Sequence, residues 1–193
     1  MRLALFSSIV LTAVLLLPGP AHALDARRDR RGVYFGLGVG GGSGTSPHDA
    51  SLRKDRGGVG MVLHARGGGG LSQKLTFDAS LTHFTQAETR AASEEVSEHT
   101  LLAVAANAYL TNHLFLRGGV GISQGSLSDT ATVLGTKLSN DASAMALGVI
   151  AGGGIEFFLG SNMAASFTLQ GQFHTAASVR FSGVLGYAGI TWY

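Results

Sequence analysis

The stretch VRFSGVLGYAGITWY, from Val179 to Tyr193, ends the chain and carries one charged residue among mainly apolar, aromatic and glycine residues. Chain ends are usually poorly ordered unless a sheet or another element holds them. An apolar end that stops on two aromatic residues therefore predicts a strand that is paired on both sides. Seven earlier segments have a similar character, so we predict an all-β fold of eight strands, closed by this one.

The other predicted strands share a period of two, in which apolar residues alternate with small or polar ones. One face of each strand is almost free of charge, and the opposite face collects polar side chains such as Arg66, Asp78 and Gln172. The segment Glu98–Leu110 is also rich in Ala and Leu, which favour helices, but its neighbours favour a strand. The predicted strands before the last are Gly32–Gly41, Gly57–Arg66, Lys74–Phe84, Glu98–Leu110, Leu114–Ser123, Ala142–Leu159 and Met163–His174.

The predicted connections alternate between long polar loops and short turns. Outer-membrane barrels have an even number of antiparallel strands, short periplasmic turns and longer outer loops. The pattern therefore predicts an antiparallel up-and-down transmembrane β-barrel with both chain ends in the periplasm. The long loops are Ser43–Arg56, Thr85–Ser97 and Gln124–Asp141, the short turns are Gly67–Gln73, Thr111–His113 and Gly160–Asn162, and Thr175–Ser178 precedes the last strand.

In such a barrel the uncharged faces meet lipid and the polar faces line the lumen. Eight strands leave an interior that side chains fill, so we expect no wide pore. Aromatic residues near the short turns predict a girdle at the membrane interface, a common place for aromatic side chains. The girdle candidates are Phe77, Tyr109, Phe115, Phe157, Trp192 and Tyr193.

The N-terminus predicts a cleaved signal peptide over residues 1–23. Arg2 precedes an apolar run, and Ala21-His22-Ala23 has the small-x-small form of a cleavage site. The run is shorter than a spanning helix needs, which argues against a membrane anchor. We assign residues 24–31 to a charged periplasmic tail and residues 32–193 to the barrel domain.

Composition restricts the function further. Charged residues make up 13% of the chain, against about a quarter in a typical soluble domain. The chain has no Cys, so disulfides and thiolate metal sites are excluded. Removing Arg2 with the signal peptide leaves 13 Lys and Arg residues against 12 Asp and Glu residues, which gives no basic face for a nucleic acid. We expect no cofactor and no metal.

The C-terminal strand, with Leu185 and Tyr187 at alternating positions before the final Trp192 and Tyr193, resembles that of the small bacterial outer-membrane barrels of the OmpA and OmpX type. The resemblance implies that Trp192 and Tyr193 form the signal read by the barrel assembly machinery. It also implies a monomer in the outer membrane of a diderm bacterium, in contact with membrane lipid and lipopolysaccharide. The expected role is structural or surface-interacting.

Four alternatives remain. A small-solute channel and a soluble lipocalin-like barrel share the strand number, but the lipocalin would place its apolar faces inside. A lipid-modifying enzyme needs a nucleophile and a base, for which His174 with Ser178, or His83 with Ser80, are the candidates. Neither lies in the His-x-Ser-Asn pattern of lipid A deacylase barrels, so we expect no enzyme. The G-x-G-x-x-G of residues 36–41 precedes a loop rather than the helix that a nucleotide site requires.

Charged residues on the polar faces predict an ion-paired network in the lumen. Arg117 lies a few residues after one short turn, and Glu156 lies a few residues before the next. Their strands are neighbours, so we expect the two side chains at similar heights and paired across the strands. Charges in a narrow lumen are costly unless paired. Asp78 and Arg66 are expected to extend the network.

Overall fold

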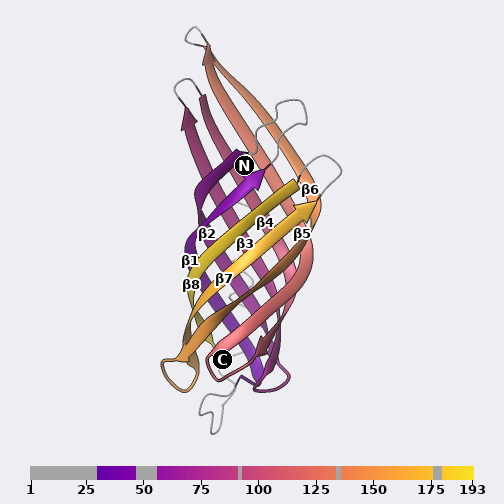
Figure 1. Ribbon diagram of the computed structural model, residues 1–193, viewed down its shortest axis with the longest axis vertical. Coiled ribbons are helices and arrows are strands. Elements are labelled where there is room, and N and C mark those ends of the chain that lie inside the picture. The colour runs from indigo at the N-terminus through magenta and orange to yellow at the C-terminus, as the bar shows by residue number, and fades with distance from the viewer. Residues whose placement is uncertain (1–29, 47–55, 91–92, 134–135, 176–179) are drawn as a thin grey trace.

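In the computed structural model, which describes residues 30–46, 56–90, 93–133, 136–175 and 180–193, the chain forms a closed barrel (Figure 1). Each strand pairs antiparallel with the next, and the last pairs with the first, so the predicted eight-stranded up-and-down barrel is confirmed. The predicted signal peptide lies outside the described residues. The strands are β1 Gly32–Ser46, β2 Arg56–Gly70, β3 Leu75–Arg90, β4 Ser93–Tyr109, β5 Leu114–Val133, β6 Thr136–Phe158, β7 Met163–Thr175 and β8 Arg180–Trp192.

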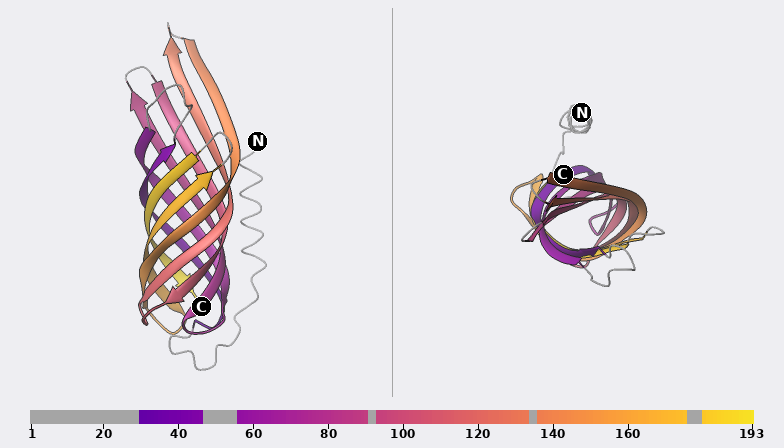
Figure 2. Two further views of the ribbon diagram at one scale, coloured as in Figure 1. Left: turned by 45° about the vertical axis from the view of Figure 1, so that its right-hand side comes forward. Right: turned by 90° about the horizontal axis from the view of Figure 1, so that it is seen from above.

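Several strands are longer than the sequence pattern predicts. Much of the predicted loops Thr85–Ser97 and Gln124–Asp141 is strand, because β3 pairs with β4 as far as Arg90↔Ser93, and β5 with β6 as far as Val133↔Thr136. The predicted loop Ser43–Arg56 likewise begins within β1 and ends within β2, with residues 47–55 outside the described part. The sequence of these segments is polar at successive positions, so it does not show the period of two that marks a strand. Because of their extra length, strands β3 to β6 rise above the other four (Figure 2).

The opposite end of the barrel holds three short turns, at residues 71–74, 110–113 and 159–162. Their backbones close in the same way, with the N–H of Leu71, Leu110 and Leu159 donating to the carbonyl four residues later. The turns are those predicted, except that residues 67–70 continue β2. The C-terminus lies at this end too (Figure 2). We refer to it as the turn end.

The outer wall of the barrel is apolar. Large hydrophobic side chains on every strand point outward, and Val59 is 81% exposed and Leu147 71%. The same strands direct buried polar side chains into the lumen. No helix in the described ranges is long and apolar enough to span a membrane. A wall with apolar residues outside and polar ones inside is the reverse of a soluble lipocalin-like barrel, which is therefore excluded.

The predicted aromatic girdle is only half correct. Phe77, Phe157 and Trp192 point outward near the turn end and are 41–48% exposed. Tyr109 and Phe115 are instead buried in the lumen, with 4% and 0% exposure. The reason is strand parity, because Phe115 shares its face with Arg117 two residues later.

The glycine run of β1 lies in the barrel wall rather than in a nucleotide-binding loop. Gly36, Gly38 and Gly40 all point toward the lumen, where an added Cβ would meet Thr191 or Tyr187 on the paired strand β8. Glycine on the inner face of β1 therefore makes room for the inward side chains of β8.

Candidate functional site

The lumen is the candidate site, and it has two layers. At the turn end, charged and hydroxyl side chains form what we call the turn-end network. Further up, apolar and imidazole side chains form what we call the aromatic cluster. The turn-end network comprises Arg30, Tyr34, Arg66, Thr76, Asp78, Ser80, Asn107, Tyr109, Arg117, Glu156, Thr191 and Tyr193, and the aromatic cluster comprises Val62, Phe84, His99, His174, Phe181, Leu185 and Tyr187.

Asp78 and Arg117 form one half of the turn-end network. Both terminal nitrogens of Arg117 donate to Asp78, Nη1 to Oδ2 and Nη2 to Oδ1, each at 2.7 Å. Asn107 lies between them on β4, donating to Asp78 at 2.7 Å and accepting from Arg117 at 2.8 Å. Ser80 accepts from Arg117 at 2.8 Å and Tyr34 donates to Asp78 at 3.0 Å. A bidentate pair with this many hydrogen bonds is the arrangement in which buried charges are tolerated.

Glu156, which is fully buried, is the centre of the other half. Its carboxylate accepts from Arg30 Nε at 2.9 Å, Arg66 Nη2 at 3.5 Å, the Tyr109 hydroxyl at 3.1 Å and the Tyr193 hydroxyl at 2.9 Å. These donors come from four separate segments of the chain. Burial raises the pKa of Tyr193 above its ordinary value, with Tyr109 and Glu156 adding to the effect, so the C-terminal phenol keeps its proton and donates.

Arg30 is an exception to the predicted charged tail over residues 24–31, of which residues 24–29 lie outside the described part. Its side chain is buried, and Nη2 donates to the carbonyl of Asn112 at 2.6 Å while Nη1 donates to that of Gln73 at 3.4 Å. The guanidinium lies 3.8 Å from the centroid of the Tyr109 ring, within cation–π range. Burial lowers the pKa of Arg30, but the hydrogen bond and charge of Glu156 outweigh burial and raise it, so the side chain stays charged.

The four predicted network residues all lie in the lumen, but the predicted pairing of Arg117 with Glu156 is wrong. Arg117 is opposite Gly152, four residues from Glu156, which corresponds to about 13 Å along the strands. The prediction counted residues from the two short turns to Arg117 and Glu156, and it assumed that both turns lie at the same height in the barrel. Instead β6 runs past the start of β5, and the Glu156 N–H donates to the carbonyl of His113 at 2.7 Å. Each residue pairs elsewhere, Arg117 with Asp78 and Glu156 with Arg30 and Arg66.

Sequence reasoning missed Arg30, Tyr34 and the inward position of Tyr193. Tyr34 joins the two halves of the network, since its ring lies 5.4 Å from that of Tyr193 and its hydroxyl reaches Asp78. Parity was an available signal, because residues 30, 32 and 34 share the inward phase of β1. Parity separates Arg30 from Arg31, which has the opposite phase, but it does not separate Arg30 from Arg28.

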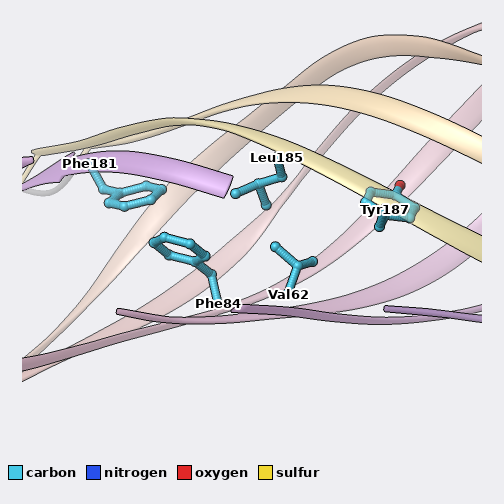
Figure 3. Close-up of a cluster of buried hydrophobic side chains, with 5 residues drawn as sticks. All are labelled: Val62, Phe84, Phe181, Leu185 and Tyr187. Carbon is cyan, nitrogen blue, oxygen red and sulfur yellow. The ribbon is translucent and has the colours of Figure 1, made fainter. Parts of the chain in front are cut away.

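The aromatic cluster fills the lumen above the network. Phe84 and Phe181 face each other across the lumen, with ring centroids 5.9 Å apart, and Val62 and Leu185 lie beside them (Figure 3). The ring of His99 packs against Phe181 at 4.0 Å. Between the two layers, an enclosed cavity beside His64, Arg66 and Tyr187 measures about 10 Å³, roughly the space of a single water. The buried side chains of the two layers fill the described lumen, which leaves no wide pore there.

The candidate catalytic pairs do not form. His83 lies on the outer side of β3, where it bonds Thr100 and Thr85, whereas Ser80 points into the lumen and bonds Arg117. His174 is buried in the lumen, and Ser178 lies outside the described residues. In the ranges that the structure describes, no three His, Asp or Glu side chains gather as metal ligands would.

No family model matches the chain, and no curated protein sequence matches it. Solved structures do match. The crystal structure of Ail, the attachment invasion locus protein of Yersinia pestis, has a TM-score of 0.62 and 14% identity, over 82% of this chain and 98% of Ail. Ail in complex with the heparin analogue sucrose octasulfate matches with a TM-score of 0.58 and 14% identity, over 83% and 99%. Neisserial surface protein A has a TM-score of 0.49 and 12% identity, over 84% and 99%.

At these identities the likeness is one of fold, and it agrees with the resemblance inferred from the C-terminal strand. The apolar outer wall needs a lipid environment, and the closed barrel leaves no unpaired sheet edge in it. Taken together, the fold, the wall and the filled lumen are those of an integral outer-membrane β-barrel protein of the small eight-stranded type.

Proposed function

We propose that the protein is a membrane-anchored surface protein, in which the barrel serves as a rigid base and the hairpins β3–β4 and β5–β6 form the surface that interacts with partners. The main support for this proposal is the length of the strands. A strand tilted in a membrane needs about 9–11 residues to cross it, whereas β5 has 20 residues and β6 has 23. About half of each strand is therefore free to extend beyond the lipid.

The orientation of the barrel in the membrane follows from the difference between its two ends. The short turns and the C-terminus lie at one end of the barrel, and the long hairpins lie at the other (Figure 1). Arg30, the first described residue, also lies at the turn end, where it bonds Asn112. Outer-membrane barrels keep short turns in the periplasm and longer connections outside. This orientation places β3–β4 and β5–β6 outside the cell. Ail, which has the same architecture, is named for attachment and invasion, and this supports an interaction role for the hairpins.

Two other functions find less support. A small-solute channel conflicts with a lumen filled by the turn-end network and the aromatic cluster, whose enclosed cavity has room for about one water. Enzyme activity has no paired nucleophile and base among the described residues, since His83 and Ser80 lie on opposite faces of β3. Ser178, the candidate partner of His174, lies outside those residues. We therefore infer a protein that is neither an enzyme nor a channel. The resemblance to the small eight-stranded barrels favours a monomer.

The positions of Trp192 and Tyr193 bear on how the barrel assembly machinery would recognise the chain. Trp192 is outward and 42% exposed, so it is accessible on the lipid side, whereas the Tyr193 hydroxyl is bound to Glu156 inside the barrel. We infer that the barrel assembly machinery reads both residues before closure. Removing residues 192–193 should then lower the amount of folded protein in the outer membrane.

Cell fractionation combined with gel mobility before and after boiling tests the membrane assignment. The folded protein should co-sediment with outer membranes and change mobility on boiling. Epitope tags placed between β3 and β4, and between β5 and β6, should be accessible on intact cells, while a tag between Asn112 and His113 should not. A soluble periplasmic protein, or labelling at Asn112 instead, would contradict the proposal.

A further inference from the structure

A groove of about 470 Å³ lies in the outer wall where β1, β6, β7 and β8 run side by side. Small residues produce it, because Ala151 on β6 and Gly171 on β7 are opposite each other and both face outward. The volume lies in the range of about 300–1,000 Å³ that is usual for small-molecule sites. The wall therefore has a hollow of ligand size on a surface that faces lipid.

Apolar side chains form the sides of the groove. Val149 and Phe173 are opposite each other on β6 and β7, and Val184 is opposite Gly171 on β8. All three side chains are about half exposed on the outer wall. Association within lipid depends on packing and hydrogen bonds rather than on the hydrophobic effect. The walls of an unfilled hollow lose dispersion contacts, and a flexible acyl chain is the component of a bilayer that can lie along such a groove.

Hydroxyl groups lie at the upper end of the groove. Thr45 Oγ1 and Ser182 Oγ are 3.0 Å apart, and Ser43 lies on the same face of β1 two residues earlier. Hydroxyls on a lipid-facing wall are costly unless they find hydrogen-bond partners. Thr45 Oγ1 is also 3.4 Å from the Ser182 carbonyl. When Thr45 donates to the Ser182 hydroxyl rather than to this carbonyl, the Ser182 hydrogen is left for an external acceptor. Ester and phosphate oxygens of a lipid are acceptors of this kind.

We propose that this groove binds lipopolysaccharide, with one acyl chain of its lipid A between Val149, Phe173 and Val184 and acceptor oxygens at Thr45 and Ser182. The groove is continuous with the lipid-facing wall and lies toward the end opposite the turns. In the proposed orientation this is the outer leaflet, where lipopolysaccharide is the main lipid. The inference thus rests on the proposed function and specifies a lipid partner for it.

The variant Gly171→Leu tests the site by filling the groove. A Cβ at Gly171 would meet only the Ala151 carbonyl, at an ordinary 3.5 Å, so the variant should fold. Gly118→Leu is the matched control, because Gly118 also faces outward, on β5, and an added Cβ there meets nothing within 4 Å. A third variant, Thr45→Val with Ser182→Ala, removes the hydroxyls without filling the groove.

Native mass spectrometry of the folded proteins in detergent, titrated with purified lipid A, gives the readout. The wild-type protein and Gly118→Leu should retain one lipid A molecule, and Gly171→Leu should bind it at least about tenfold more weakly. The double hydroxyl variant should fall between them. Equal retention by Gly171→Leu and the wild type would overturn the proposal, as would equal retention of phosphatidylethanolamine in place of lipid A.

The failure of the proposed function is distinguishable from the failure of this site. Each protein is first checked for the mobility change on boiling and for sedimentation with the outer membrane. A wild-type protein that fails these checks contradicts the membrane assignment itself. A protein that passes them but shows no difference between Gly171→Leu and Gly118→Leu contradicts the lipid site alone.

Discussion

The two layers of the lumen satisfy their polar groups to very different degrees. In the turn-end network the carboxylates of Asp78 and Glu156 each accept several hydrogen bonds, and one buried side-chain atom, Arg117 Nε, has no partner among the described residues. In the lumen beyond the turn-end network, from His64 upward, the unpartnered buried atoms among the described residues are Gln86 Oε1, Gln170 Nε2, Gln172 Nε2, His64 Nε2 and both ring nitrogens of His174.

This difference in hydrogen bonding indicates which layer contributes more to the stability of the barrel. A buried polar atom without a partner costs about 1–3 kcal/mol, whereas a fully connected network stabilises one arrangement of side chains. The turn end is also where eight strands, three turns and the C-terminus must meet in one register. We therefore expect substitutions in the turn-end network to destabilise the barrel far more than substitutions of equal size in the upper lumen.

Glu156→Gln should have the largest effect. It removes the single carboxylate that Arg30 and Arg66 share, leaving two buried cations unpaired, so we expect a loss of about 4 kcal/mol in the free energy of unfolding. Urea unfolding of the barrel in phospholipid vesicles, followed through the fluorescence of Trp192, measures it. The exposed Glu98→Gln is the control and should change stability by less than about 0.5 kcal/mol. A similar loss in both variants would contradict a special role for Glu156.

Arg117→Met should lower the free energy of unfolding by about 3 kcal/mol, since Asp78 loses its bidentate partner. The double variant Asp78→Leu/Arg117→Met should lose less than the sum of the two single variants, because no unpaired charge remains. The double-mutant cycle in the same unfolding assay gives the coupling. Strict additivity would show that the two side chains act independently.

Arg30→Ala should reduce the free energy of unfolding by about 2 kcal/mol, less than Glu156→Gln, because Arg66 and two tyrosines still donate to the carboxylate. The neighbouring Arg31→Ala is the comparison, since Arg31 is exposed and has the opposite phase. We expect Arg31→Ala to cost clearly less. An equal loss from both would show that the charge of the segment matters rather than the burial of Arg30.

Gln172→Leu in the upper lumen should have the smallest effect, within about 1 kcal/mol and of either sign. The substitution keeps much of the side-chain volume and removes an amide nitrogen that has no partner among the described residues. A loss as large as that of Arg117→Met would remove the contrast between the layers. The measurement is again the urea midpoint, with the slope of the transition compared to check that the barrel unfolds in one step.

The architecture was readable from the sequence because its determinants are local. A period of two in eight segments assigned each residue to the lumen or the lipid, and Arg66, Asp78, Arg117 and Glu156 all lie on the predicted inner face. The alternation of short and long connections predicted the topology. Strand extent was harder, since β3 to β6 continue through residues that are polar on both faces.

Partner choice inside the lumen depended on tertiary structure alone. Which carboxylate meets which arginine is set by the register of neighbouring strands and by the stagger of a closed sheet, and neither can be counted from turn positions. Register placed Glu156 beyond the start of β5, within reach of Arg30, Arg66 and Tyr193, and placed Arg117 beside Asp78 across β4. The sequence thus determined which face each side chain occupies, and barrel closure decided the height at which the charges meet.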